Sequence, residues 1–335
     1  MALDKYQSMR DFERTAEPSG TDEPEISEHE ARGEPRFVVQ EHHATALHWD
    51  FRLERGGVLV SWALPKGVPP HPKVNNMAVH TEDHPLSYFD FAGDIPEGEY
   101  GGGKVMLWDQ GTYDELKWSD REVMVVLHGE RARGKYVLFK TGNDARSWMI
   151  HRMDPPEDPT RELVPRDVRP AAPEEGPLPR GDAARGWRWM PTWGGARVAI
   201  TVEGGRCTAR EAAGDDVTKA WKVLAPFGRA VGSLAVVFAG ELVHASASSK
   251  DGGAVFLDDV LWLDGHDVSA LPFATRRSRL EETGLEGPAW HVAPAFDEPA
   301  VLLEAAAAQG LPGILGVRDD APYGPPRLVR TGDVA

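Results

Sequence analysis

The sequence has little cysteine, no long apolar run and no excess of positive charge. Its single cysteine, Cys207, cannot form an intramolecular disulfide. Residues 1–10 lack the apolar stretch of a signal peptide, so we expect a cytoplasmic protein. No segment approaches the ~20 consecutive apolar residues that a membrane-spanning helix needs. These absences argue against a disulfide-stabilised secreted protein and against a role in a membrane.

The net charge is −16, from 37 basic and 53 acidic residues among 335, which argues against broad electrostatic binding to nucleic acid. The charge is unevenly distributed. Residues 1–35 carry 4 basic and 10 acidic groups, residues 36–152 carry 14 and 16, and residues 153–335 carry 19 and 27. A local basic pocket in the nearly neutral middle block could bind a phosphate, although charge alone would not hold a long duplex there.

Composition divides the chain into four parts. Residues 1–35 form an acidic arm, low in aromatic residues, for which we expect partial disorder and assign no secondary structure, unless it folds back onto the domain that follows. Residues 36–152 hold eight short strand-like runs separated by Gly, Pro or Asp, which predicts an all-β, β-barrel-like or sandwich domain. Residues 153–186 are rich in proline and predict a linker. Residues 187–330 mix strand-like and helix-like runs, so the expected fold class is mixed, with an α+β second domain.

Possible metal ligands are densest in the run HHATALHWDFR. Alternate side chains of a strand share a face, so His48, Asp50 and Arg52 should project together, away from the apolar residues between them. Two imidazoles and a carboxylate suit a divalent ion of the Mn or Zn type, and His42 lies six residues before His48, across an expected bend. We therefore expect His42, His48 and Asp50 to bind a metal, with Arg52 forking onto an anionic oxygen beside it.

A second run, MAVHTEDH, places His80, Glu82 and His84 on one strand face in the same way. Lys66 and Tyr88 add a cation and a hydroxyl donor nearby in the sequence. Each of these residues alone is more often a solvated or structural group, whereas the whole set favours a joint site. The glycine-rich segment 95–103 lacks the lysine–serine end of a P-loop and predicts a hairpin connection.

The runs at 37–67 and 78–114 resemble the 3′-phosphoesterase domain of bacterial DNA ligase D, and RDFERTAEPSG resembles its leader. The resemblance implies a β-barrel-like, Mn-dependent enzyme, with Zn or Co as other ions, that removes 3′-terminal ribonucleosides and 3′-phosphates from DNA during end joining. It implies His42, His48 and Asp50 as metal ligands. The residues that it implies at the phosphate or in support of the transition state are Arg52, Lys66, Glu82, His84, Tyr88, Asp11 and Glu17.

Three positions depart from that family's pattern. Glu41 stands where the family usually has a lysine, Asn76 where it usually has an arginine, and a histidine at position 80 is not typical. Loss of a phosphate-binding cation should weaken substrate affinity, whereas the three metal ligands are retained. We therefore expect the activity to survive.

The run MPTWGGARVAITVEGGRCTAREAAGDDVT and later segments resemble the adenylation domain of ATP-dependent DNA ligases, which implies a nucleotidyltransferase-like fold. Thr192 stands where that family has the lysine that attacks ATP, and only an amine can form lysyl-AMP. Gly194 replaces an aspartate, Asp258 replaces an aromatic residue, and a second lysine is missing from 312–316. Family positions are kept at Glu241, Arg197 and Arg210. The resemblance therefore implies a catalytically inactive ligase-like domain.

Two other functions remain open at this point. His48, Asp50 and His84 could form the facial triad of a non-haem iron oxygenase. Alternatively, the chain could be a non-catalytic scaffold that binds DNA ends and recruits a separate ligase, primase or end-binding protein. The expected partners of the esterase are DNA 3′ ends, including ends with a terminal ribonucleotide, at the nucleoid in the cytoplasm.

Overall fold

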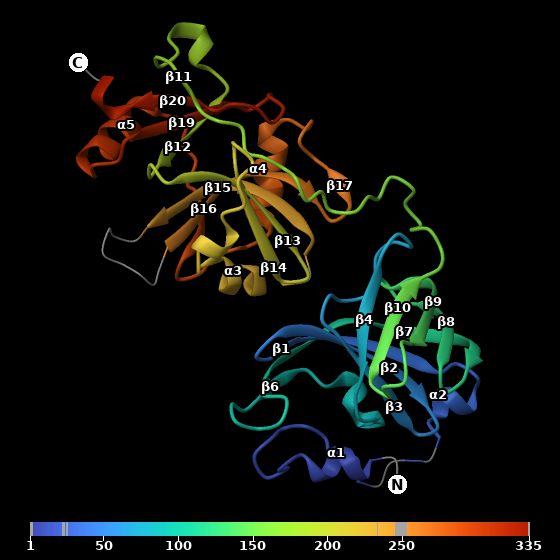
Figure 1. Ribbon diagram of the computed structural model, residues 1–335. Coiled ribbons are helices and arrows are strands. Elements are labelled where there is room, and N and C mark those ends of the chain that lie inside the picture. The colour runs from blue at the N-terminus through green and yellow to red at the C-terminus, as the bar shows by residue number, and fades with distance from the viewer. Residues whose placement is uncertain (1–2, 22–23, 25, 233, 245–252, 334–335) are drawn as a thin grey trace. The chain divides into compact units, whose positions relative to one another are not determined.

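The computed structural model describes residues 3–21, 24, 26–232, 234–244 and 253–333. The chain divides into two compact units, Met1–Pro159 and Thr160–Ala335 (Figure 1). Each unit has its own hydrophobic core. The division falls inside the proline-rich segment 153–186.

Eight antiparallel strands of the first unit close into a barrel. Their order is β1-β2-β3-β4-β10-β9-β8-β7, and β7 pairs back onto β1. This closure confirms the predicted barrel-like domain, and every predicted run contributes a strand. The strands are β1 (Arg36–His43), β2 (Leu47–Arg55), β3 (Val58–Leu64), β4 (Asn75–His80), β7 (Gly103–Trp118), β8 (Glu122–His128), β9 (Arg133–Lys140) and β10 (Ser147–Arg152).

Residue alternation on β2 sets the two faces of this barrel. Trp49, Phe51 and Leu53 are fully buried in the main core, with apolar side chains from the other strands. The residues between them therefore point to the outer face, because successive side chains of a strand alternate. A second cluster, with Val38 and Leu59, covers that outer face.

The outer face is covered by short elements from distant parts of the sequence. They are α1 (Asp4–Ser8), α2 (Glu28–Ala31), β5 (His84–Pro85), the 3₁₀ helix η1 (Leu86–Asp90) and β6 (Gly93–Ile95). β5 pairs with β3, and β6 pairs with β7. Ile95 lies opposite Gly103 in the second pairing, which confirms the hairpin predicted for 95–103.

The described part of residues 1–35 folds back onto the barrel, the alternative left open above, and it contains two short helices where none was assigned. Tyr6 of α1 is fully buried beside Val38, Leu59 and Tyr88, and Phe12 packs on the same cluster. Burial of one such aromatic side chain contributes roughly 1.5–3 kcal/mol, which offsets the entropy lost when the segment is ordered. The packing of Tyr6 and Phe12, and not the average composition, therefore determines that this segment is ordered.

The second unit contains two sheets and three α-helices among its described residues. The strand orders are β11-β20-β19-β12 and β14-β13-β15-β16-β17, with β18 paired to β16. This mixture agrees with the α+β prediction. The elements are β11 (Glu174–Glu175), η2 (Gly181–Ala184), β12 (Trp187–Thr192), β13 (Ala196–Glu203), β14 (Arg206–Glu211), η3 (Thr218–Ala220), α3 (Leu224–Val231), β15 (Val236–His244), β16 (Gly253–Leu263), β17 (His266–Asp267), α4 (Phe273–Glu282), β18 (Trp290–Val292), α5 (Pro299–Ala308), β19 (Gly313–Arg318), β20 (Arg327–Arg330) and η4 (Thr331–Asp333). None of the described helices is long and apolar enough to span a bilayer.

Most of the predicted linker 153–186 is part of the second unit. Val164 is buried against Ala199 and Val237, and β11 pairs in parallel with β20. An apolar anchor and backbone hydrogen bonds hold this stretch on the domain, although its prolines cannot donate such bonds. The linker is therefore shorter than its composition indicated.

Candidate metal centre

Three side chains converge on the outer face of the barrel, at the end where β1 turns into β2. One ligand atom each of His42, His48 and Asp50 lies within 4.8 Å of the others. His42 and His48 are directly opposite in the antiparallel register, and their ring centroids are 4.7 Å apart. Asp50 is two residues beyond His48 on the same face. The alternation of β2 and the register of β1 together place the three groups that the sequence predicted as ligands.

Main-chain carbonyls orient both imidazoles toward this shared point. His42 Nε2 is 2.8 Å from the carbonyl oxygen of Gly101, and His48 Nδ1 is 2.9 Å from that of Ala46. A carbonyl only accepts, so each of these ring nitrogens carries the hydrogen. The opposite nitrogens, His42 Nδ1 and His48 Nε2, then keep a free lone pair and lie 3.4 and 3.6 Å from oxygens of Asp50. Fixing of the tautomer in this way is typical of metal-binding histidines.

The segment 96–102 supplies the carbonyl that holds His42, and its glycines allow the approach. Gly101 has φ +78°, in the left-handed region that L side chains rarely adopt. A Cβ at Gly103 would lie 2.3 Å from the carbonyl oxygen of His43, so only glycine fits there. The glycine-rich hairpin therefore has a role in the site other than phosphate binding.

A buried arginine holds the carboxylate. Arg52 donates hydrogen bonds to Asp50 Oδ2 (3.0 Å), Gln40 Oε1 (2.8 Å) and Ser61 Oγ (2.9 Å). Burial alone would raise the pKa of Asp50, but the charge of the Arg52 guanidinium outweighs it and leaves that pKa well below its usual range. Asp50 is therefore an anion at any pH at which the protein would work. The guanidinium of Arg52, which we expected to bind an anionic oxygen beside the metal, is instead hydrogen-bonded to side chains of the protein.

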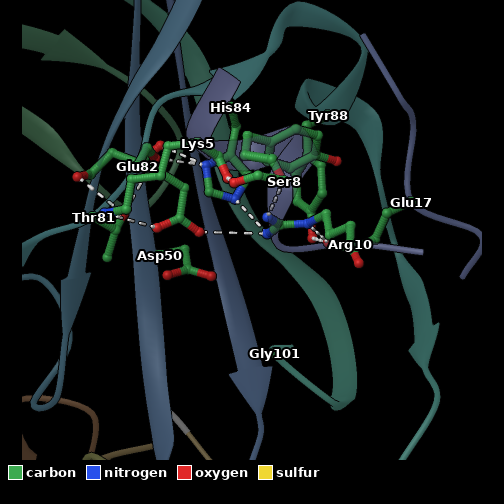
Figure 2. A network of polar contacts seen from close by, with 12 residues as sticks. Lys5, Ser8, Arg10, Glu17, Asp50, Thr81, Glu82, His84, Tyr88 and Gly101 are labelled. Carbon is green, nitrogen blue, oxygen red and sulfur yellow. Dashed lines mark hydrogen bonds and ion pairs between the residues drawn. The ribbon is translucent and has the colours of Figure 1, made fainter. Parts of the chain in front are cut away.

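A second cation, Arg10, lies at the centre of the polar network beside Asp50. Figure 2 shows its guanidinium between Glu17 on one side and Glu82 and His84 on the other. Arg10 Nε donates to Glu17 Oε1 at 2.9 Å, and Nη2 lies 3.6 Å from Glu82 Oε1. Its side chain is only 5% exposed. Sequence reasoning missed this residue, although it directly precedes Asp11 in the leader-like segment that drew attention.

His84 and Tyr88 belong to the same network. His84 Nδ1 donates to the carbonyl of Glu82 at 2.9 Å, and Nε2 lies 3.3 Å from Arg10 Nη2, from which it accepts. Burial, then the charges of Arg52 and Arg10, lower the pKa of His84 well below its usual value, so the ring is neutral at neutral pH. The Tyr88 hydroxyl donates to Glu17 Oε1 at 3.0 Å.

The remaining predicted site residues lie apart from this group. Lys66 is exposed in the turn after β3, and no contact joins it to the trio among the described residues. Asp11 is exposed, and its carboxylate accepts from the backbone N–H of Glu13, where it caps a local turn. His80 ends β4 and packs against Trp62 and Trp148, so the expected face of His80, Glu82 and His84 is not continuous.

Two positions that depart from the resembled family have structural partners. Asn76 donates to the carbonyl of Gly67 at 2.8 Å, and Glu41 accepts from His43 Nε2 at the same distance. Neither side chain contacts the trio in the described part of the chain.

The ligase-like positions of the second unit bond to one another. Thr192 donates its hydroxyl to Glu241 Oε1 at 2.5 Å, and the backbone N–H of Trp193 donates to Glu241 Oε2 at 2.9 Å. Arg197 forms a two-pronged ion pair with Asp258, with one hydrogen bond of 2.9 Å. Burial would lower the pKa of Arg197, but Asp258 raises it further above its already high value. Asp258 therefore occupies both terminal nitrogens of Arg197, whereas the buried Nε of Arg197 has no hydrogen-bond partner among the described residues.

The sequence is similar to a known domain family and to known proteins. Residues 40–140 match the family described as the DNA Ligase D 3'-phosphoesterase domain. The multifunctional non-homologous end joining DNA repair protein LigD of Mycobacterium tuberculosis is 38% identical over 295 residues, which cover 83% of this chain and 38% of that protein. The LigD of Pseudomonas aeruginosa is 30% identical in an alignment 387 positions long, gaps included, which covers 96% of this chain and 45% of that protein.

The chain thus spans less than half the length of these relatives. Among solved structures, the ligase domain of M. tuberculosis LigD covers 49% of this chain and 58% of its own, with 22% identity and a TM-score of 0.42.

Proposed function

Because the chain carries a DNA Ligase D 3'-phosphoesterase domain and is similar to LigD proteins along most of its length, we propose that its barrel unit is a metal-dependent 3′-phosphoesterase. It removes 3′-phosphates and 3′-terminal ribonucleosides from DNA ends during end joining. Its partners are DNA 3′ ends at the nucleoid in the cytoplasm, and a separate ligase, primase or end-binding protein completes the repair. The convergence of His42, His48 and Asp50 carries this proposal.

The donor set fits a divalent ion of the Mn type, with Zn or Co as other ions. Two ring nitrogens with free lone pairs and one carboxylate are borderline ligands that these ions accept. When bound, the ion would neutralise charge on a phosphate oxygen and make the phosphorus more electrophilic. His48 is the most exposed of the three, with 22% of its side chain accessible against 7% for His42, so the phosphate enters from the His48 side.

The chain's own residues set up the charge around this ion. Arg52 keeps Asp50 ionised and in place, which makes it a positioning residue. Arg10 supplies positive charge beside the trio and is held by Glu17 and Glu82. Neutral His84 accepts from Arg10 and orients it, instead of acting as the protonated acid that the sequence allowed. Lys66 is exposed in the turn after β3, and there it would bind a phosphate farther along the DNA strand.

The test is release of a 3′-terminal phosphate or ribonucleoside from a 5′-labelled primer-template, with Mn, Zn, Co or Mg and with chelator. We expect Mn-dependent release that chelator abolishes and that His48→Ala and Asp50→Ala both lose. Asp114→Ala is the matched control, since Asp114 also pairs with a histidine but lies exposed on β7. Wild-type turnover in Asp50→Ala would refute the proposed ligands.

The same assay separates two other functions. Tight binding of DNA ends without cleavage under any divalent ion would favour a non-catalytic scaffold. The oxygenase needs His84 as a ligand together with His48 and Asp50, but both ring nitrogens of His84 are engaged by Glu82 and Arg10. The donor geometry therefore favours the esterase.

For the second unit we propose a ligase-like domain without adenylation activity. Thr192 offers a hydroxyl, not an amine, at the position of the nucleophile, and that hydroxyl is bound to Glu241. The Arg197–Asp258 ion pair occupies the neighbouring polar groups. This domain would contribute to the binding of DNA ends or of a partner.

A further inference from the structure

Tyr100 is an exposed aromatic residue next to the candidate metal centre. Its side chain is 45% exposed, and it is the one aromatic among the large exposed apolar residues described in the first unit. The residue that follows it, Gly101, accepts the hydrogen bond from His42. A half-exposed aromatic ring next to the residue that bonds to His42 is available for contact with a ligand at the trio.

The segment around Tyr100 is held in place at several points. Glu99 pairs with Arg14 at 2.8 Å, and the backbone N–H groups of Glu99 and Gly102 donate to carbonyls within the segment. The guanidinium carbon of Arg10 lies 5.4 Å from the centre of the Tyr100 ring. The Tyr100 ring is therefore held close to Arg10 by a segment whose next residue, Gly101, bonds to His42, and part of its surface is open to solvent.

We propose that Tyr100 is the surface on which the base of the 3′-terminal nucleoside stacks while its phosphate lies at the trio. This inference rests on the proposed function and adds the group that recognises the nucleoside. Every base has an aromatic face, so such stacking tolerates any sequence, as an enzyme that processes broken ends requires. The recognised ligand class is a strand with an intact terminal base.

The kinetic test compares two 3′-phosphorylated strands, one that ends in a normal nucleotide and one that ends in an abasic residue. For the normal end we expect Tyr100→Ala to raise KM by about tenfold to a hundredfold, the value of one stacked base, with kcat little changed. Tyr100→Phe keeps the ring and should stay near wild type. On the abasic end, Tyr100→Ala should match wild type. Leu116→Ala, which removes an equally exposed side chain from the far end of β7, is the control.

An equal KM increase on both strands, or none on either, would overturn the role of Tyr100. A binding measurement separates this failure from failure of the esterase proposal. In chelator, a strand with 2-aminopurine at its 3′ end should lose fluorescence on binding to wild type and to Tyr100→Phe, but not to Tyr100→Ala. If the wild-type protein cleaves neither strand, the esterase proposal fails. The fluorescence measurement still tests whether the terminal base stacks on Tyr100. Quenching that is absent in wild type or unchanged in Tyr100→Ala refutes it.

Discussion

Arg52 donates a hydrogen bond of 3.0 Å to Asp50 from a side chain that is only 2% exposed. Both residues lie on the outer face of β2, two positions apart, so the strand itself sets their spacing. The carboxylate is thereby fixed with one oxygen toward Arg52 and His42 and the other toward His48. A buried ion pair of this kind orients a metal ligand more than it stabilises the fold.

Arg52→Lys should lower the affinity for Mn by about tenfold to a hundredfold, because a lysine keeps the charge but cannot bond to Asp50, Gln40 and Ser61 in the same fork. The affinity for Mn is measured by isothermal titration calorimetry. Arg55→Lys is the matched control, since Arg55 ends the same strand but is exposed and pairs with Glu115. Equal affinities in the two variants would show that the fork is not needed.

Gly101→Ala should also weaken metal binding, through His42. Alanine is strained at φ +78° by about 1–2 kcal/mol, and relief of that strain moves the carbonyl that holds the ring. Gly98→Ala serves as the control, because Gly98 has φ +92° in the same segment and an added Cβ would meet no atom within 4 Å. Both variants carry backbone strain, and only Gly101→Ala should lose Mn affinity. A similar loss in both would assign the effect to the segment as a whole.

Glu54 should make stability depend on pH. Burial raises its pKa, but hydrogen bonds from the side chain and backbone of Arg36 prevail and lower the pKa overall. A lowered folded-state pKa gives stability that is present above the unfolded value of about 4.3 and is lost as the pH falls through the folded value. Glu54→Gln should therefore cost about 2 kcal/mol at pH 7 and much less at pH 3, as measured by urea unfolding. A cost that does not change with pH would contradict this account.

The second unit should not form a covalent adenylate. After incubation with α-labelled ATP and a divalent ion, the protein should carry no label in a denaturing gel, because Thr192 has no amine. A ligase with an intact lysine, treated in parallel, verifies the assay. Label retained by this chain would show that a residue other than Thr192 attacks ATP and forms a covalent adenylate.

The sequence by itself determined the barrel strands and brought together the three candidate metal ligands. The two-residue period of β2 separates Trp49 and Phe51 from His48, Asp50 and Arg52, and this separation holds wherever the strand is placed. The short connection 44–46 between two strand-like runs forces an antiparallel pair. Local rules therefore sufficed to bring together three candidate ligands, His42, His48 and Asp50, that lie within nine residues of one another.

Only the tertiary structure decided the rest of the site. Arg10 reaches His84, which lies 74 residues away in the sequence, because Tyr6 is buried on the outer face of the barrel and carries the N-terminal segment with it. The same packing makes His84 neutral, and the end of β4 at His80 turns that histidine away toward Trp62. Contacts of this kind depend on which apolar surfaces meet, and residue spacing along one strand carries no information about that.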